Sequence, residues 1–194
     1  MGFSDVTVLH SHIHNLGVAT LHSIMPFSVP KADEKAKETL KKALFGENIS
    51  YEIPNSPYNK KGNTTGILVG GNLSILYSLL GSKSSINTKD KILFIEDLDE
   101  YLYHVDRMMM NLKRNGYFDQ IRGIIVGGMT DMHDNSIPFG RNASEIILDI
   151  TQEFDIPICF DFPAGHLSDN RALFFGKTID FEVSDKFTKV KFEI

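Results

Sequence analysis

The sequence predicts an α/β fold whose sheet is parallel in its central part and antiparallel at one end. Short apolar runs of strand length, such as Ile67–Val69, Ile92–Ile95 and Ile124–Val126, alternate with amphipathic segments of helical length. This alternation is typical of parallel βαβ units. The tail from Ala172 to Phe192 instead alternates with period two, which indicates antiparallel strands.

The first part of the chain predicts two helices and one strand. Ser4 or Asp5 is suited to cap a helix that ends at Gly17. A short buried strand over 18–21 and an amphipathic helix over 32–45 follow, and then a polar hairpin or linker over 50–65. The apolar side chains that fall near helical spacing in the first helix are Val6, Val8, Leu9, Ile13 and Leu16.

After residue 65 the pattern becomes regular. The predicted strands cover 67–69, 91–95, 121–126 and 158–162, and the predicted helices cover 73–80, 101–113 and 143–154. In the second of these helices, Met108, Met109 and Met110 are interpreted as core-filling side chains, because methionine adapts to irregular gaps.

Composition excludes several classes of protein. With 194 residues and a net charge of −5, the chain lacks the basic stripe of a duplex-binding protein, so no nucleic acid is expected as a partner. No run reaches the roughly 18 apolar residues of a membrane span. Cys159 is the single cysteine, which excludes an intramolecular disulfide and a cysteine-cluster zinc site and is compatible with a reducing cytoplasm.

Four polar segments follow predicted strands or precede a predicted helix, where functional groups of open α/β sheets collect. They are Gly2–Asp5, Gly70–Leu73, Glu96–Glu100 and Pro163–His166. Each also has a plain structural reading: a helix cap for the serine, a tight turn for the glycines, a solvated loop for the acids, and a surface or capping role for the histidine.

Together these segments supply a nucleophile, an acid and an imidazole. A serine hydroxyl needs an adjacent base, and a carboxylate orients that base. The chain order Ser4, Glu96, His166 is that of the α/β-hydrolases, but Gly2-Phe3-Ser4-Asp5-Val6 lacks the second glycine of their Gly-x-Ser-x-Gly turn. A different kind of serine hydrolase is indicated.

The sequence resembles the serine LD-carboxypeptidases and the related microcin-immunity peptidases over nearly its whole length. The motifs that carry this resemblance are Gly2-Phe3-Ser4-Asp5-Val6-Thr7, Gly70-Gly71-Asn72-Leu73-Ser74-Ile75-Leu76, Leu93-Phe94-Ile95-Glu96-Asp97, Gly165-His166 and Arg171-Ala172-Leu173-Phe174-Phe175-Gly176. The resemblance implies that Ser4 is the nucleophile, Glu96 the acid and His166 the base. The backbone amide of Asp5 is then an oxyanion donor and Asn72 a candidate substrate contact, with no metal and no organic cofactor.

The resemblance also implies a domain organisation. Residues 1–28 correspond to the end of a nucleophile-bearing N-terminal domain, 29–62 to a linker with an amphipathic helix, and 63–194 to a C-terminal domain that carries the acid and the base. Complete members have most of the first domain before the serine motif, so this chain is expected to be a fragment or a truncated form. The implied reaction releases D-alanine from a murein tetrapeptide in the cytoplasm, and a homodimer is the expected assembly.

Three alternatives stay open. The chain is a hydrolase of microcin-like acyl conjugates, or it is a non-catalytic C-terminal module that dimerises or binds peptide. The histidines of His10-Ser11-His12-Ile13-His14, with His22 nearby, are the third alternative, a transition-metal site. The predicted helix disfavours that site, because His12 then points away from the face that His10 and His14 share.

Overall fold

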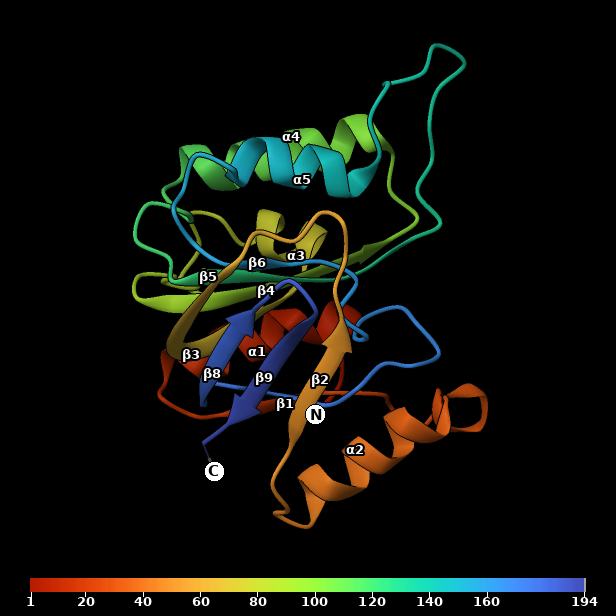
Figure 1. Ribbon diagram of the computed structural model, residues 1–194, viewed down its shortest axis with the longest axis vertical. Coiled ribbons are helices and arrows are strands. Elements are labelled where there is room, and N and C mark those ends of the chain that lie inside the picture. The colour runs from red at the N-terminus through yellow and green to blue at the C-terminus, as the bar shows by residue number, and fades with distance from the viewer. Residues whose placement is uncertain (194) are drawn as a thin grey trace.

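The computed structural model describes residues 1–193 and has a mixed α/β fold (Figure 1). Its helices are α1 (Thr7–Asn15), α2 (Glu34–Leu44), α3 (Leu73–Ser78), α4 (Leu102–Arg114) and α5 (Ala143–Thr151), with 3₁₀ turns η1 (Ser4–Val6) and η2 (Val29–Lys31). Its strands are β1 (Thr20–His22), β2 (Ser50–Pro54), β3 (Gly62–Asn72), β4 (Lys91–Leu98), β5 (Gly123–Thr130), β6 (Ile158–Cys159), β7 (Leu173–Phe175), β8 (Thr178–Val183) and β9 (Phe187–Phe192).

Within residues 1–193 the strands form a seven-stranded sheet, in the order β2-β9-β8-β3-β4-β5-β6, and a two-stranded sheet of β1 and β7. β3 to β6 are parallel, whereas β8, β9 and β2 are antiparallel to their neighbours. β3 joins the two parts: its first half pairs with β8 and its second half with β4. The predicted fold class is therefore confirmed.

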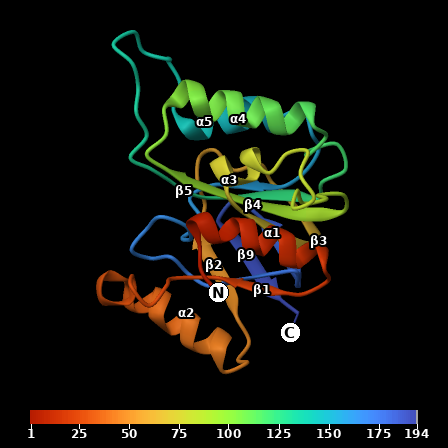
Figure 2. The same ribbon diagram turned by 180° about the vertical axis from the view of Figure 1, so that it is seen from behind.

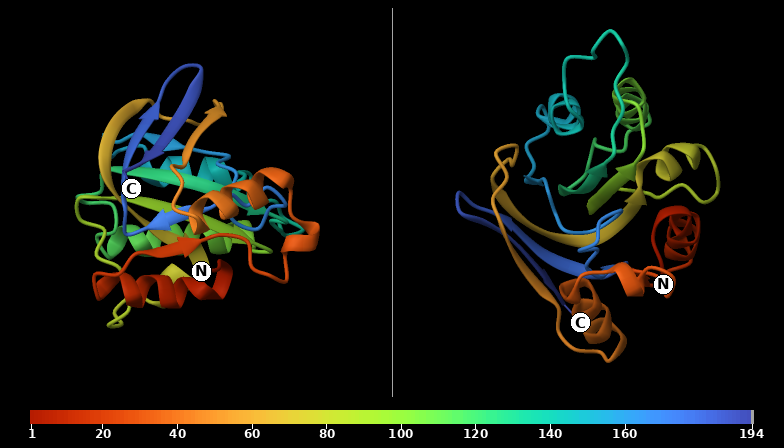
Figure 3. Two further views of the ribbon diagram at one scale, coloured as in Figure 1. Left: turned by 90° about the horizontal axis from the view of Figure 1, so that it is seen from below. Right: turned by 90° about the vertical axis from the view of Figure 1, so that its right-hand side faces the viewer.

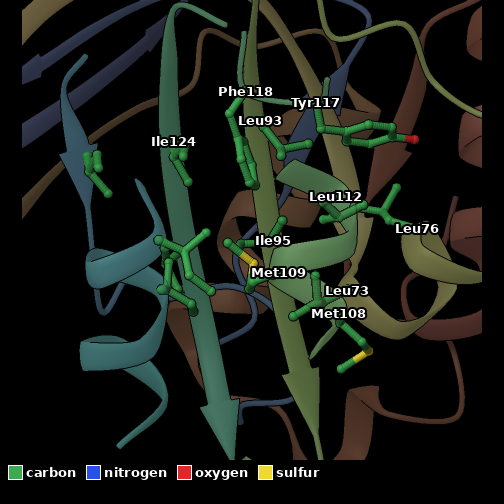
Figure 4. Close-up of a cluster of buried hydrophobic side chains, with 14 of the residues drawn as sticks. Leu73, Leu76, Leu93, Ile95, Met108, Met109, Leu112, Tyr117, Phe118 and Ile124 are labelled. Atoms are coloured by element: carbon green, nitrogen blue, oxygen red, sulfur yellow. The ribbon is translucent and has the colours of Figure 1, made fainter. Parts of the chain in front are cut away.

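Helices α4 and α5 lie side by side over one face of the parallel strands, with α3 next to them (Figure 1). Leu93, Ile95 and Ile124 of the strands pack there against apolar side chains of α4 (Figure 4). A second apolar cluster, which includes Phe94 and Phe181, fills the opposite face of the sheet. Burying a side chain of this size stabilises the fold by roughly 1.5–3 kcal/mol, so the two clusters hold the strands that carry the site.

The N-terminal segment packs on the edge of this core. α1 contacts β3, α3 and β1, and β1, drawn below α1 in Figure 2, pairs with β7. α2 lies at the opposite end of the molecule from α4 and α5, as Figures 1 and 3 show. Among residues 1–193, no helix combines the length and apolar character that a membrane crossing requires.

The structure changes several of the predicted boundaries. Residues 50–54, expected in a hairpin or linker, form β2, which pairs along its whole length with β9. The strand predicted over 91–95 continues to Leu98, and the one predicted over 158–162 is only two residues long. The division into 1–28, 29–62 and 63–194 stays a prediction, with β2 in the same sheet as the strands of the third segment.

The apolar spacing of the first predicted helix does not identify the face that is buried. The buried residues of α1 are Thr7, His10 and Ser11, whereas Val8 and Leu9 are 39% and 56% exposed. Neither Ser4 nor Asp5 caps the helix through its side chain, because the residue before α1 is Val6 and no side-chain cap bond is present there. The predicted core role of the methionines is confirmed for Met108 and Met109, which are fully buried.

Candidate active site

Ser4 lies on a sharp turn between an extended segment and a helix. Gly2 pairs in parallel with β1: its amide donates to the Leu21 carbonyl (3.0 Å), and its carbonyl accepts from the Ser23 amide (3.1 Å). Ser4 then adopts φ +61°, and η1 and α1 follow directly. A positive φ is uncommon for a non-glycine residue and costs about 1–3 kcal/mol, and such strain clusters at functional sites. This is the strand-turn-helix geometry that exposes a nucleophilic serine.

Glycine is required two residues before the serine. Gly2 has φ +152°, and a Cβ there would lie 2.8 Å from a methyl carbon of Val6. The turn therefore closes tightly only because residue 2 has no side chain.

Glu96, near the carboxyl end of β4, forms an acid–base pair with the partly buried His166. Glu96 is fully buried, and its Oε2 accepts hydrogen bonds from His166 Nδ1 (2.7 Å) and from the His166 amide (3.1 Å). Because a carboxylate only accepts, the proton lies on Nδ1 and leaves Nε2 as the basic nitrogen. This is the tautomer that a general base needs.

The turn that carries His166 is shaped around the carboxylate. Gly165 has φ +105°, and a Cβ there would lie 2.6 Å from Glu96 Oε2. The Gly165 amide donates to Asn170 Oδ1 (2.9 Å), and the Thr130 hydroxyl donates to the His166 carbonyl (3.2 Å). Glycine directly before His166 therefore allows the Glu96 carboxylate to approach the imidazole.

The Ser4 turn lies beside His166. The Phe3 ring packs edge-on against the imidazole, with ring centroids 4.9 Å apart. Burial lowers the pKa of His166, but the hydrogen bond and charge of Glu96, followed by the charges of Asp97 and Asp5, raise it more, so the net pKa lies above 6.5. Among the hydrogen bonds of residues 1–193, none joins the Ser4 hydroxyl to His166. Such bonds are often long in a free enzyme and tighten when substrate binds.

Asp97 is a structural partner that the sequence did not single out. It is 2% exposed and accepts from Asn72 Nδ2 (2.8 Å), the Ser74 amide (2.9 Å) and the Leu98 amide (2.9 Å). Burial raises its pKa to about 6, against the lowering effect of these hydrogen bonds. Glu96 and Asp97 thus lie inside β4, and the solvated-loop reading of the acidic run fails for both.

Asn72 caps helix α3. Its Oδ1 accepts from the Ile75 amide (3.1 Å) and the Ser74 hydroxyl (2.7 Å), while its Nδ2 donates to Asp97. The side chain is thereby held between β3, β4 and α3. A substrate contact from Asn72 stays a prediction, and the contacts in the structure are internal.

The histidine run does not converge on a common point. His10 is buried and bonds to Thr20 and Gly2, whereas His12 is exposed and bonds to Ser84. His22 is enclosed among aromatic rings, and burial lowers its pKa to about 3. Across residues 1–193, no group of three or more histidine, cysteine, aspartate or glutamate side chains is arranged to hold a metal ion.

A cavity of about 520 Å³ lies next to the acid–base pair. Its lining includes Thr130, which bonds to the His166 carbonyl, and Leu167, the next residue along the chain. The lining also includes Asn142 and Ser144, at the start of α5, and Tyr58.

A serine on a strained strand-to-helix turn, next to an imidazole paired with a buried carboxylate, is the arrangement that serine hydrolases use. Residues 65–181 match the LD-carboxypeptidase C-terminal domain. The chain therefore belongs to the LD-carboxypeptidase family.

Several relatives are similar over almost the whole chain. It is 34% identical to a probable murein peptide carboxypeptidase of Bacillus subtilis, a match that covers 95% of this chain and 60% of the relative. It is 27% identical to the murein tetrapeptide carboxypeptidase of Pseudomonas aeruginosa, with 94% and 62% covered. The chain thus spans about 60% of the length of these relatives.

Solved structures agree with the fold. The muramoyltetrapeptide carboxypeptidase of Oxalobacter formigenes superposes with a TM-score of 0.90 at 20% identity, covering 100% of this chain and 67% of that one. A structure of MccF in complex with glutamyl sulfamoyl guanosine has a TM-score of 0.80 at 20% identity, with 98% and 66% covered.

Proposed function

We propose that the protein acts as a serine-type LD-carboxypeptidase, which releases the terminal D-alanine of a murein tetrapeptide. The observation that carries the proposal is the pairing of the buried Glu96 with His166 beside the strained Ser4 turn. Family membership and the names of the relatives support the substrate class.

In the proposed mechanism, His166 Nε2 takes the proton of the Ser4 hydroxyl as its oxygen attacks the carbonyl before the D-alanine. The backbone amide of Asp5, at the start of the helix, donates to the developing oxyanion. Glu96 keeps the proton on Nδ1 and stabilises the imidazolium. His166 then protonates the leaving amine, and water that it activates hydrolyses the acyl-enzyme.

The test is the release of D-alanine from a murein tetrapeptide. Because the relatives are longer, we would assay both the chain alone and a fusion that places the preceding segment of the Bacillus subtilis relative before Met1. The proposal predicts release that the Ser4→Ala variant abolishes in whichever form is active. Release that survives Ser4→Ala would reject Ser4 as the nucleophile.

A second candidate is the hydrolysis of microcin-like acyl conjugates. The microcin C7 self-immunity protein MccF of Escherichia coli is 30% identical over 116 residues, which is 58% of this chain. An aminoacyl sulfamoyl nucleoside, offered in the same assay, distinguishes the two: cleavage of it without release of D-alanine favours this candidate.

The reactivity of Ser4 distinguishes an enzyme from the non-catalytic alternative. A fluorophosphonate labels a serine only where a base activates it. If Ser4 is labelled in the wild type and not in His166→Ala, the result supports an enzyme. If Ser4 is labelled in neither the wild type nor the variant, the result favours a non-catalytic module that binds peptide or dimerises. A homodimer and a cytoplasmic location stay predictions. Analytical ultracentrifugation measures the oligomeric state directly.

A further inference from the structure

The buried face of α1 is polar. Thr7 and His10 lie one helical turn apart, are 0% and 2% exposed, and each bonds to a different backbone group. Ser11, the third buried residue of the helix, makes no hydrogen bond through its hydroxyl within the part of the chain that the structure describes. A helix that buries polar side chains forgoes apolar burial, and the hydrogen bonds of Thr7 and His10 offset the cost of burying these two side chains.

His10 bonds to the segment that leads into the nucleophile. Its Nε2 lies 3.0 Å from the Gly2 carbonyl oxygen, and its Nδ1 lies 2.8 Å from the Thr20 hydroxyl. A carbonyl only accepts, so Nε2 carries the proton and Nδ1 accepts from Thr20. Burial lowers the pKa of His10, and the hydrogen bond to Gly2 raises it by a smaller amount. The net lowering keeps the ring neutral near pH 7.

Thr7 bonds to β3, the strand that pairs with the one holding the acid. Its hydroxyl accepts from the Asn72 amide (2.9 Å), at the end of β3. A Cβ on Gly71 would lie 2.3 Å from this hydroxyl, so the contact exists only because residue 71 is glycine. Asn72 in turn donates to Asp97, the neighbour of Glu96 on β4.

We infer that Thr7 and His10 are positioning residues, which together fix the Ser4 turn in register with the Glu96–His166 pair. The inference rests on the proposed role of Ser4. His10 holds the carbonyl two residues before the nucleophile, and Thr7 ties the helix after it to β3, the strand that pairs with the one holding the acid. A residue in the left-handed region persists only where its surroundings over-determine it, and these two contacts supply that constraint on either side of Ser4.

The first measurement is the rate at which a fluorophosphonate labels Ser4 in the chain and its variants. We expect His10→Ala and Thr7→Val to lower this rate by about 100-fold, the order of effect for a misplacement near 1 Å. His10→Gln keeps a donor for Gly2 and Thr7→Ser keeps the hydroxyl, so both should stay within about threefold of the wild-type rate. His12→Ala, an exposed histidine of the same helix, is the matched control and should label as the wild type does.

The second measurement is independent of reactivity. Nitrogen NMR of the His10 ring should show the neutral tautomer protonated on Nε2, and the backbone shifts of Ser4 should report a positive φ that His10→Ala and Thr7→Val remove. Rates measured well below each unfolding midpoint separate positioning from a loss of stability.

The two proposals fail in different ways. A wild-type chain that is not labelled, yet loses the Ser4 conformation in His10→Ala and Thr7→Val, contradicts the proposed function for the isolated chain and supports the positioning role. Labelling and Ser4 shifts that both stay at wild-type values in His10→Ala and Thr7→Val overturn the positioning role. An Nδ1-protonated His10 overturns it as well.

Discussion

Helices α1 and α4 lie in the same fold and have opposite buried faces. α4 buries Val105, Met108, Met109 and Leu112, an apolar stripe at helical spacing. α1 buries Thr7, His10 and Ser11 and leaves Val8 and Leu9 exposed. One helix serves the core and the other serves the site. The spacing of apolar residues predicts which face is buried for a helix such as α4, which packs on the core, and not for a helix such as α1.

The largest expected effect on stability is in α4. Leu112 is fully buried between α4 and the sheet, so Leu112→Ala should lower the free energy of unfolding by about 3 kcal/mol, through lost burial and the cavity left behind. Leu9→Ala, on the exposed side of α1, should change it by less than about 0.5 kcal/mol. Urea unfolding of both variants measures the difference, and equal losses would show that the apolar face of α1 is buried in solution.

The next effect is expected at Gly165, where the site meets the core. Gly165→Ala adds a Cβ 2.6 Å from Glu96 Oε2 at a positive φ, and should cost about 2 kcal/mol and displace the carboxylate from His166. Labelling of Ser4 should fall with it. Gly140→Ala is the matched control, since Gly140 has φ +84° with no atom within 4 Å of the added Cβ. If both variants lose the same stability and neither loses labelling, the contact with Glu96 is unimportant.

These two variants mark what the sequence could and could not predict. The apolar runs predicted β4 and α4, since local periodicity follows burial there, and the motifs predicted that Glu96 and His166 meet, as they do. The pairing of β2 with β9 joins segments about 140 residues apart, and no local pattern reports it. The role of Thr7 depends on a backbone amide of β3, a contact that the motif containing Thr7 did not predict.

The pH dependence of the site should show two opposite trends. Because the folded pKa of His166 lies above 6.5, its stabilising pair with Glu96 is fully present below about pH 6.5 and is lost as the pH rises through the folded value. The difference in unfolding midpoint between wild type and His166→Gln should therefore be larger near pH 5.5 than near pH 8.5. Labelling of Ser4 needs the neutral imidazole and should rise over the same range.

His12→Gln is the control for both trends, because His12 is exposed and its ring hydrogen-bonds to the Ser84 hydroxyl, away from the site. A labelling rate that falls with rising pH, or a difference in midpoint that grows with it, would contradict the sign assigned to the His166 pKa.

The smallest effect concerns the entry to α1. Ser4 is held at φ +61°, where glycine is free of the Cβ clash that any other residue meets. Ser4→Gly should therefore be more stable than Ser4→Ala by about 1 kcal/mol, although both lack the nucleophile. At Ser78, in the last turn of α3, the order should reverse, because glycine in a helix is about 1 kcal/mol less favourable than alanine. Thermal unfolding of the four variants tests this reversal. If Ser4→Gly is the less stable of its pair, the strain at the turn is absent in solution, and the contacts of Thr7 and His10 have no strained conformation to hold.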